Sequence, residues 1–342
     1  MKPMLRKIAT GFAGVLIWVN QISAAEPVTI DLTQWTPPDI ATVGDDPFGK
    51  LVKYGRALFT DTANEIGPAG ADTNKRFSGN NLACQNCHLQ AGTQPYAMPM
   101  IGVWGQFPQY RGREGMVVTL EERINGCLER SMNGRPLPIG SGEMKAFSSY
   151  IRWLSTGVPD GAKLRGAGTL RIKEPDRAAD PHRGAEIYAK ACLACHGADG
   201  SGVRAQNGYG YQIPPLWGPD SYNNGAGMSR ILTAAGYALH NMPLGTRFDS
   251  PFLTDDEAYD VAGYIVSQSR PDKANLEKDY PIRLQKPIDS PYGPYADGFA
   301  AEQHRLGPFG PIRAKVKELA SESRIANAGG PDDGSHRADD MR

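Results

Sequence analysis

The chain has 342 residues, of which 37 are basic and 37 are acidic. This balance excludes the one-sided positive charge that is typical of nucleic-acid-binding proteins, so we expect no nucleic-acid partner. The length favours two domains over one.

Residues 1–25 have the order of a secretory signal peptide. Cations among the first seven residues precede a mostly apolar stretch, residues 8–19, and small residues at 23–25 offer a cleavage site. The apolar stretch is short for a membrane span, so cleavage after Ala25 is favoured over an uncleaved anchor. We therefore predict a mature chain that is exported to the periplasm and has no membrane span.

Two Cys-x-x-Cys-His runs stand at 84–88 and 192–196. In such a run the two thiols form thioethers with the two vinyl groups of a haem, and the adjacent histidine becomes an axial ligand of the iron. Zinc and disulfide interpretations also exist for paired cysteines, but a zinc site needs four converging ligands and neither run has a second pair nearby. We therefore predict two covalently bound haem c groups, held by Cys84, Cys87, His88, Cys192, Cys195 and His196.

Helices of matching character flank both runs. Residues 55–59 and 184–188 precede the runs, and residues 143–154 and 255–265 follow them with Tyr-Ile at corresponding places. A capping box, Thr254 to Glu257, predicts the start of the last helix. An N-terminal helix that crosses a C-terminal helix, with haem between them, is the cytochrome c arrangement. The predicted fold is all-α, with two cytochrome c-like domains.

The domain boundaries follow from composition. Between the two domains lies a polar, glycine-rich stretch without apolar periodicity, which is typical of a linker. Pro-rich segments flank the domains, and the last residues, from about Ser321, are polar enough to predict disorder. The predicted organisation is a signal peptide (1–25), a domain for haem 1 (26–157), a linker (158–182), a domain for haem 2 (183–270) and an extended, partly disordered tail (271–342).

Cys127 is the fifth cysteine, so it has no intramolecular disulfide partner once four thiols hold haem. Three interpretations are open: a buried inert thiol, a bridge between two chains, and a distal ligand of haem 1. The last is favoured by nearby cations, among them Arg123 and Arg113, because cations stabilise the thiolate that binds iron. The same cations suit a small sulfur oxyanion, although each arginine alone also fits a solvated surface.

The chain resembles the thiosulfate dehydrogenases, which are dihaem cytochromes that join two thiosulfates into tetrathionate. The resemblance covers about residues 54–270. It is carried by Ala83-Cys-Gln-Asn-Cys-His-Leu-Gln-Ala-Gly92, by Arg123-Ile-Asn-Gly-Cys-Leu-Glu-Arg-Ser-Met-Asn-Gly-Arg-Pro-Leu-Pro138, and by Asn241-Met-Pro-Leu-Gly245. The middle segment is the most specific, since ordinary cytochromes c have no reason to carry it.

The resemblance implies roles for residues of the middle segment. Cys127 would be the distal ligand of haem 1, opposite His88, and a nucleophile toward thiosulfate. Arg113, Arg123 and Ser131 would bind thiosulfate. Electrons would pass through haem 2 to a small c-type cytochrome or a similar periplasmic acceptor, and the reverse reaction, tetrathionate reduction, is also open.

Haem 2 needs a distal ligand opposite His196. We predict Met242, because a thioether is a usual partner of an electron-transfer haem. His240 is the alternative, and Met228 is a weaker one. Some family members carry a lysine beside this methionine that competes for the iron. Asn241 stands there in this chain, so the resemblance does not extend to that ligand switch.

Two other functions are compatible with the motifs. An electron carrier without a substrate would need neither Cys127 nor the arginines. A thiosulfate-conjugating subunit of a sulfur-oxidation complex also uses a cysteine-ligated haem, but it needs a carrier protein as acceptor. Two complete haem domains on one chain favour the dehydrogenase.

Overall fold

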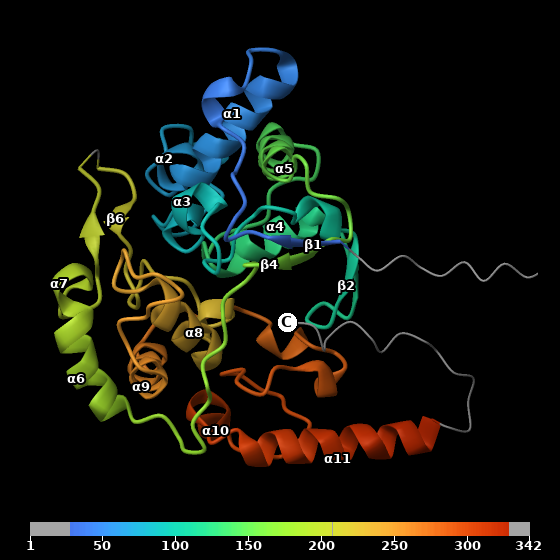
Figure 1. Cartoon of the computed structure of the whole chain (residues 1–342), viewed down its shortest axis with the longest axis vertical. Coiled ribbons are helices and arrows are strands. Elements are labelled where there is room, and N and C mark those ends of the chain that lie inside the picture. Colours follow the sequence, from blue (N-terminus) through green and yellow to red (C-terminus); the bar gives the residue numbers. More distant parts are fainter. Residues whose placement is uncertain (1–27, 207, 328–342) are drawn as a thin grey trace, which may run out of the picture.

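The computed structural model describes residues 28–206 and 208–327, which form two helical units (Figure 1). The predicted signal peptide and residues 328–342 lie outside the described residues. None of the helices in the described ranges combines the length and the apolar character that a membrane crossing requires.

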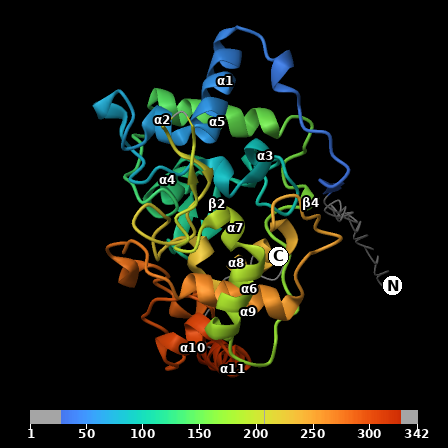
Figure 2. The ribbon, with the colours of Figure 1, turned by 90° about the vertical axis from the view of Figure 1, so that its left-hand side faces the viewer.

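The N-terminal unit is built on α1 (Pro47–Thr60), which crosses α5 (Gly142–Leu154) (Figure 2). Asp46 caps α1 by accepting hydrogen bonds from the first backbone N–H groups. A Cβ on Gly55 would lie 2.0 Å from the carbonyl oxygen of Ala146, so only glycine permits this crossing. The other helices of the unit are α2 (Thr62–Ile66), α3 (Leu89–Gly92) and α4 (Leu120–Arg130).

The C-terminal unit repeats the arrangement with α6 (Pro181–Ala191) and α9 (Asp255–Val266), which cross in the same way (Figure 2). A Cβ on Gly184 would lie 2.1 Å from the carbonyl oxygen of Asp260. The capping box at Thr254 is confirmed, since both of its hydrogen bonds to Glu257 are present. This unit also contains α7 (Leu193–His196) and α8 (Ile231–Asn241). The predicted pair of cytochrome c-like domains is confirmed.

Each unit has its own apolar core. In the N-terminal unit, Leu58, Phe59 and Tyr150 are buried between α1 and α5. In the C-terminal unit, Tyr188 and Tyr259 are buried together with one face of α8. The two cores leave the cysteine runs at their edges, where a haem would complete each of them.

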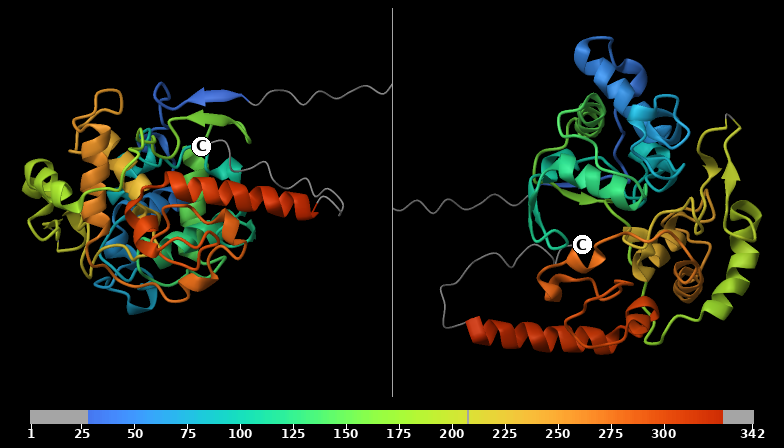
Figure 3. Two further views of the ribbon diagram at one scale, coloured as in Figure 1. Left: turned by 90° about the horizontal axis from the view of Figure 1, so that it is seen from below. Right: turned by 180° about the vertical axis from the view of Figure 1, so that it is seen from behind.

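The strands are short and form three two-stranded sheets. β1 (Thr29–Asp31) pairs in parallel with β4 (Lys163–Arg165), as Figure 3 shows. β2 (Gln109–Arg111) and β3 (Met116–Val118) form an antiparallel hairpin. β5 (Val203–Arg204) and β6 (Tyr211–Ile213) form another. The predicted linker therefore contains a strand, and α6 begins just inside its predicted end. Single 3-10 turns lie at η1 (Ile40–Thr42), η2 (Thr73–Lys75), η3 (Cys84–Asn86), η4 (Trp104–Gln106), η5 (Gly227–Ser229), η6 (Leu276–Lys278) and η7 (Arg283–Gln285).

The C-terminal extension differs from the prediction of an extended, partly disordered tail. It contains α10 (Ala301–Leu306) and α11 (Gly310–Asn327), so the prediction is wrong for these residues, including the polar ones from Ser321 to Asn327. The reason is tertiary: Phe309 and Ile312 are fully buried in the core of the C-terminal unit and anchor α11 there. Figure 1 shows α11 starting beside α10 and extending away from α6 and α9.

Candidate active site

His88 lies between η3 and α3 with its ring oriented by the backbone. Its Nδ1 is 2.6 Å from the carbonyl oxygen of Met98. Because a carbonyl only accepts, Nδ1 carries the proton and Nε2 keeps the lone pair that binds a metal. Burial, opposed by the Met98 hydrogen bond and assisted by the positive charge of Arg123, lowers the pKa of His88 to about 4. The imidazole is therefore neutral at neutral pH, as an iron ligand must be.

The thiols of the first run are held beside α2. The backbone N–H of Cys84 donates to the Thr62 hydroxyl (3.2 Å), which in turn lies 3.6 Å from the Cys84 sulfur. Burial raises the pKa of Cys84 to about 12 and that of Cys87 to about 11. Two buried thiols and an oriented, neutral imidazole on one short turn fit the covalent attachment of haem.

A strained segment shapes this site. Gln90, Ala91, Tyr96 and Met98 all have positive φ, a conformation that costs non-glycine residues free energy. The hydroxyl of Tyr150 on α5 donates to the carbonyl of Ala91 (2.7 Å), which stabilises one end of the segment. The result is a loop that turns back and presents the Met98 carbonyl to His88.

Three predicted residues share one face of α4. Arg123, Cys127 and Ser131 are spaced four apart, so their side chains follow one stripe of the helix. Arg123 Nη1 donates to Cys127 Sγ across 2.7 Å. This face of α4 lies close to the haem 1 residues, because a negative charge on Cys127 would raise the pKa of both Cys84 and Cys87.

Ser131 and Arg113 differ in their contacts. Ser131 continues the helix, since its N–H donates to the carbonyl of Cys127 (2.8 Å). Arg113 lies in the turn between β2 and β3, and its contacts run to the C-terminal extension rather than to Cys127. Its Nε donates to the hydroxyl of Tyr280 (3.3 Å). Burial acts to lower the pKa of Arg113, but the tyrosines and Asp279 around it raise it overall.

His196 repeats the geometry of His88. Its Nδ1 is 2.9 Å from the carbonyl oxygen of Pro214, which leaves Nε2 for a metal, and burial lowers its pKa. Burial also raises the pKa of Cys192 to about 11. Tyr188 packs its ring 5.1 Å from that of Trp217 beside this run. These residues fit a second haem c.

The two candidate distal ligands of haem 2 lie at the C-terminal end of α8. Ile231, Ala235 and Leu239 form the face that packs into the C-terminal core, and Met242, the C-cap with an extended backbone, stands three residues after Leu239. His240 is nine residues after Ile231, half a turn away from that face.

His240 instead lines a cavity of about 590 Å³ together with Leu89, Gln90 and Gln94, which follow His88 in the chain. Its Nδ1 is 3.2 Å from the carbonyl oxygen of Phe248, and its buried Nε2 has no hydrogen-bond partner among the described residues. His240 therefore faces a cavity that it shares with residues following His88.

Helix α8 of the C-terminal unit also contacts the first haem run and the loop after it, which the sequence did not indicate. The hydroxyl of Tyr237 donates to the carbonyl of Cys87 (2.9 Å). The buried amide of Asn241 donates to the carbonyl of Tyr96 (3.2 Å) and accepts from Gln94 (3.0 Å). These partners are more than a hundred residues apart in sequence, so no local pattern could have revealed them.

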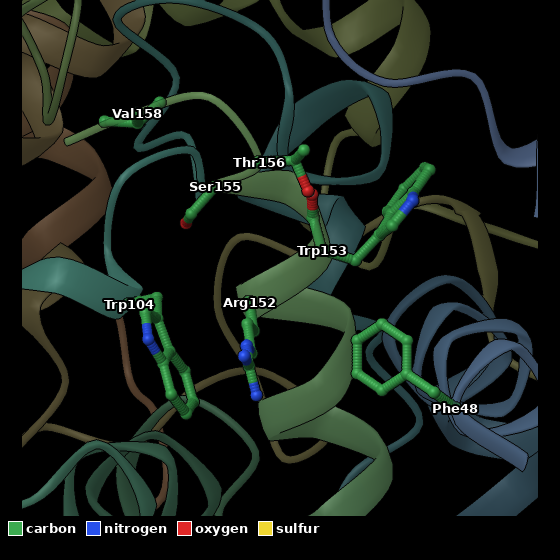
Figure 4. A pocket seen from close by; sticks show the side chains of 7 residues that line it. All are labelled: Phe48, Trp104, Arg152, Trp153, Ser155, Thr156 and Val158. Carbon is green, nitrogen blue, oxygen red and sulfur yellow. The ribbon is translucent and has the colours of Figure 1, made fainter.

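Another cavity, of about 470 Å³, lies beside α5 in the N-terminal unit (Figure 4). Arg152 stands there between two aromatic rings, 6.0 Å from the centroid of Phe48 and 5.4 Å from that of Trp104. None of the predicted haem or thiosulfate residues lines it. The candidate active site is therefore distinct from this cavity.

Comparisons with known proteins agree with the geometry. A family model described as SoxA/TsdA, cytochrome c domain, matches residues 69–159, and one described as Cytochrome c matches residues 181–269. The chain is 44% identical over 255 residues to a thiosulfate dehydrogenase of Allochromatium vinosum, which covers 72% of this chain and 87% of that relative. The chain belongs to the thiosulfate dehydrogenase family.

Other members of the family give the same result. A thiosulfate dehydrogenase of Thiomonas intermedia is 38% identical over 277 residues, covering 81% of this chain and 83% of its own. A solved thiosulfate dehydrogenase (TsdBA) from Marichromatium purpuratum superposes with a TM-score of 0.64 at 39% identity. That match covers 71% of this chain and about half, 51%, of the solved chain. As a thiosulfate dehydrogenase family member, this protein is an oxidoreductase whose two cytochrome c domains imply haem c binding.

Proposed function

We propose that this protein oxidises two thiosulfates to one tetrathionate at a haem ligated by His88 and Cys127, and passes the two electrons through a second haem to an external acceptor. The observation that carries the proposal is the hydrogen bond of Arg123 to the Cys127 sulfur on a helix face beside His88. An electron carrier has no need of a cation placed on a sulfur. The thiosulfate dehydrogenases to which the chain is similar support the substrate.

Arg123 has two tasks in this proposal. Its guanidinium stabilises the thiolate of Cys127, and it offers further N–H donors to the sulfonate oxygens of thiosulfate. Ser131, one turn further along α4, adds a hydroxyl donor, and Arg113 adds a second cation. Two thiosulfate dianions repel each other, and the fixed positive charges of Arg123 and Arg113 would reduce this repulsion.

The sulfur chemistry is proposed to run in two steps. First, the Cys127 thiolate and the outer sulfur of one thiosulfate form a sulfur–sulfur bond and release two electrons. Second, the outer sulfur of another thiosulfate attacks the sulfur attached to Cys127, the bond to Cys127 breaks, and tetrathionate leaves with Cys127 again a thiolate. When bound, the haem pair would accept the two electrons one at a time. The reverse sequence reduces tetrathionate with the same residues.

Met242 is proposed as the distal ligand of haem 2, opposite His196. The support is that His240 lines the cavity beside Leu89 and Gln90, whereas Met242 directly follows α8, three residues after Leu239 of the C-terminal core, and is not among the residues that line that cavity. We further propose a small periplasmic c-type cytochrome or a similar protein as acceptor. This location follows from the predicted signal peptide of residues 1–25.

The test uses the full, haem-loaded chain with thiosulfate and an artificial one-electron acceptor. The proposal predicts that two acceptor molecules are reduced and one tetrathionate is formed for every two thiosulfates consumed. A protein that accepts electrons from other reductants but never from thiosulfate would be an electron carrier. Reduction that requires an added carrier protein would instead identify a conjugating subunit.

A further inference from the structure

The turn that carries Arg113 is held by the C-terminal extension. The backbone N–H of Tyr280 donates to the carbonyl of Arg113 (2.8 Å), and Arg113 Nε donates to the Tyr280 hydroxyl (3.3 Å). The guanidinium also lies 5.7 Å from the centroid of the Tyr280 ring. One residue of the extension therefore contacts both the backbone and the charged group of Arg113.

The rest of the β2–β3 hairpin is clamped by neighbours of Tyr280. Tyr110 donates its hydroxyl hydrogen to Gln285 (2.9 Å). Gly115 has a φ of +67°, and a Cβ there would lie 2.3 Å from the ring of Pro281. The hairpin thus has little freedom to move against the extension.

Tyr280 is itself fixed. It is buried and has a positive φ, and the preceding Asp279 binds Arg130 across 2.7 Å with both side chains almost fully buried. Tyr292 donates a further hydrogen bond to Asp279 (2.6 Å). Arg130 is three residues after Cys127 on α4, so two adjacent residues of the extension connect the hairpin of Arg113 with the helix of Cys127.

We infer that Tyr280 is a positioning residue for thiosulfate binding, which acts by fixing the guanidinium of Arg113; this rests on the role of Arg113 in the proposed function. The hydroxyl of Tyr280 occupies one of the five N–H donors of Arg113 and sets the plane of the group. The remaining donors then meet a sulfonate oxygen from a fixed direction. Without the hydroxyl, the cation remains but its orientation is lost.

The test replaces Tyr280 by Phe, which keeps the ring and the backbone N–H and removes only the hydroxyl. The expected result is a rise in the thiosulfate KM of about fivefold, the size of one ordinary hydrogen bond, with kcat little changed. Tyr295→Phe is the matched control, since that hydroxyl donates to the carbonyl of Ser290 within the same extension and does not contact Arg113. Its KM should equal that of the wild type.

A double variant separates positioning from a general loss of structure. In an Arg113→Ala background, Tyr280→Phe should not raise KM further, because the group that it orients is gone. Wild-type turnover with an unchanged KM in Tyr280→Phe, or an equal rise in both backgrounds, would overturn this inference alone. No tetrathionate from the wild type would overturn the proposed function and the inference with it.

Discussion

Arg123 and Cys127 lie one turn apart on α4, and the guanidinium of the first donates to the sulfur of the second across 2.7 Å. Both side chains are half-buried, so the contact is only partly screened by water. One rigid helix thereby supplies both the sulfur and its cation. The geometry does not depend on a loop closing over the site.

The first prediction concerns the charge of Arg123. Arg123→Gln should raise the thiosulfate KM by at least about tenfold, because a hydrogen bond that involves a charged group contributes about 1.5–3 kcal/mol. Steady-state kinetics with an artificial acceptor measures it. Arg152→Gln removes an exposed cation at the other cavity and should leave KM unchanged. Equal effects of the two variants would mean that only the overall charge attracts the substrate.

The second prediction separates the two candidate ligands of haem 2. Met242→Leu should lower the reduction potential of one haem, because a thioether ligand favours the reduced iron, and should slow the reduction of the acceptor. His240→Gln should leave both properties close to those of the wild type. Redox titration followed by visible absorption measures the potentials. The opposite pattern would make His240 the ligand and would contradict the assignment to Met242.

The third prediction is a pH dependence of stability in the C-terminal extension. Lys286 is buried beside the rings of Tyr292 and Tyr295, and this burial, with help from Arg283, lowers its pKa to about 8. In the unfolded chain its pKa returns to about 10.5. Between these values the unfolded state binds more protons at this site, so its contribution to the free energy of unfolding increases as the pH rises.

The variant Lys286→Met provides the comparison for that contribution. The free energy of unfolding of the wild type, relative to the variant, should increase from about pH 7.5 to about pH 9.5. Urea unfolding followed by tryptophan fluorescence at both pH values measures the difference. A constant difference would show that the amine keeps its ordinary pKa in the folded protein, and a difference that decreases with pH would show that folding raises this pKa; either result contradicts the prediction.

Local sequence patterns were sufficient for the repeated architecture. Gly55 and Gly184 each lie on the helix that precedes a cysteine run, and each allows a helix crossing with a close backbone contact. The capping box at Thr254 fixed the start of α9 from four residues. Arg123, Cys127 and Ser131 were predicted from the resemblance to thiosulfate dehydrogenases, and their spacing of four places them along one side of α4.

Contacts between distant segments could not be predicted in this way. Arg113 is hydrogen-bonded to Tyr280, which is 167 residues away in the sequence, and Tyr237 is hydrogen-bonded to Cys87, which is 150 residues away. No periodicity or spacing encodes such pairs, because they depend on how complete units pack. Helix α11 was missed for a different reason: polar composition outweighed the helical spacing of Ile312 and Val316, whose packing anchors it.

The most direct test of the proposed reaction is tetrathionate formation by the wild type beside Cys127→Ala, with both proteins carrying two haems. We predict that the wild type forms tetrathionate from thiosulfate, and that the variant forms none while its second haem can still be reduced by an artificial donor. Tetrathionate formation by Cys127→Ala at the wild-type rate would contradict the account, because the sulfur that Arg123 contacts would then have no part in the reaction.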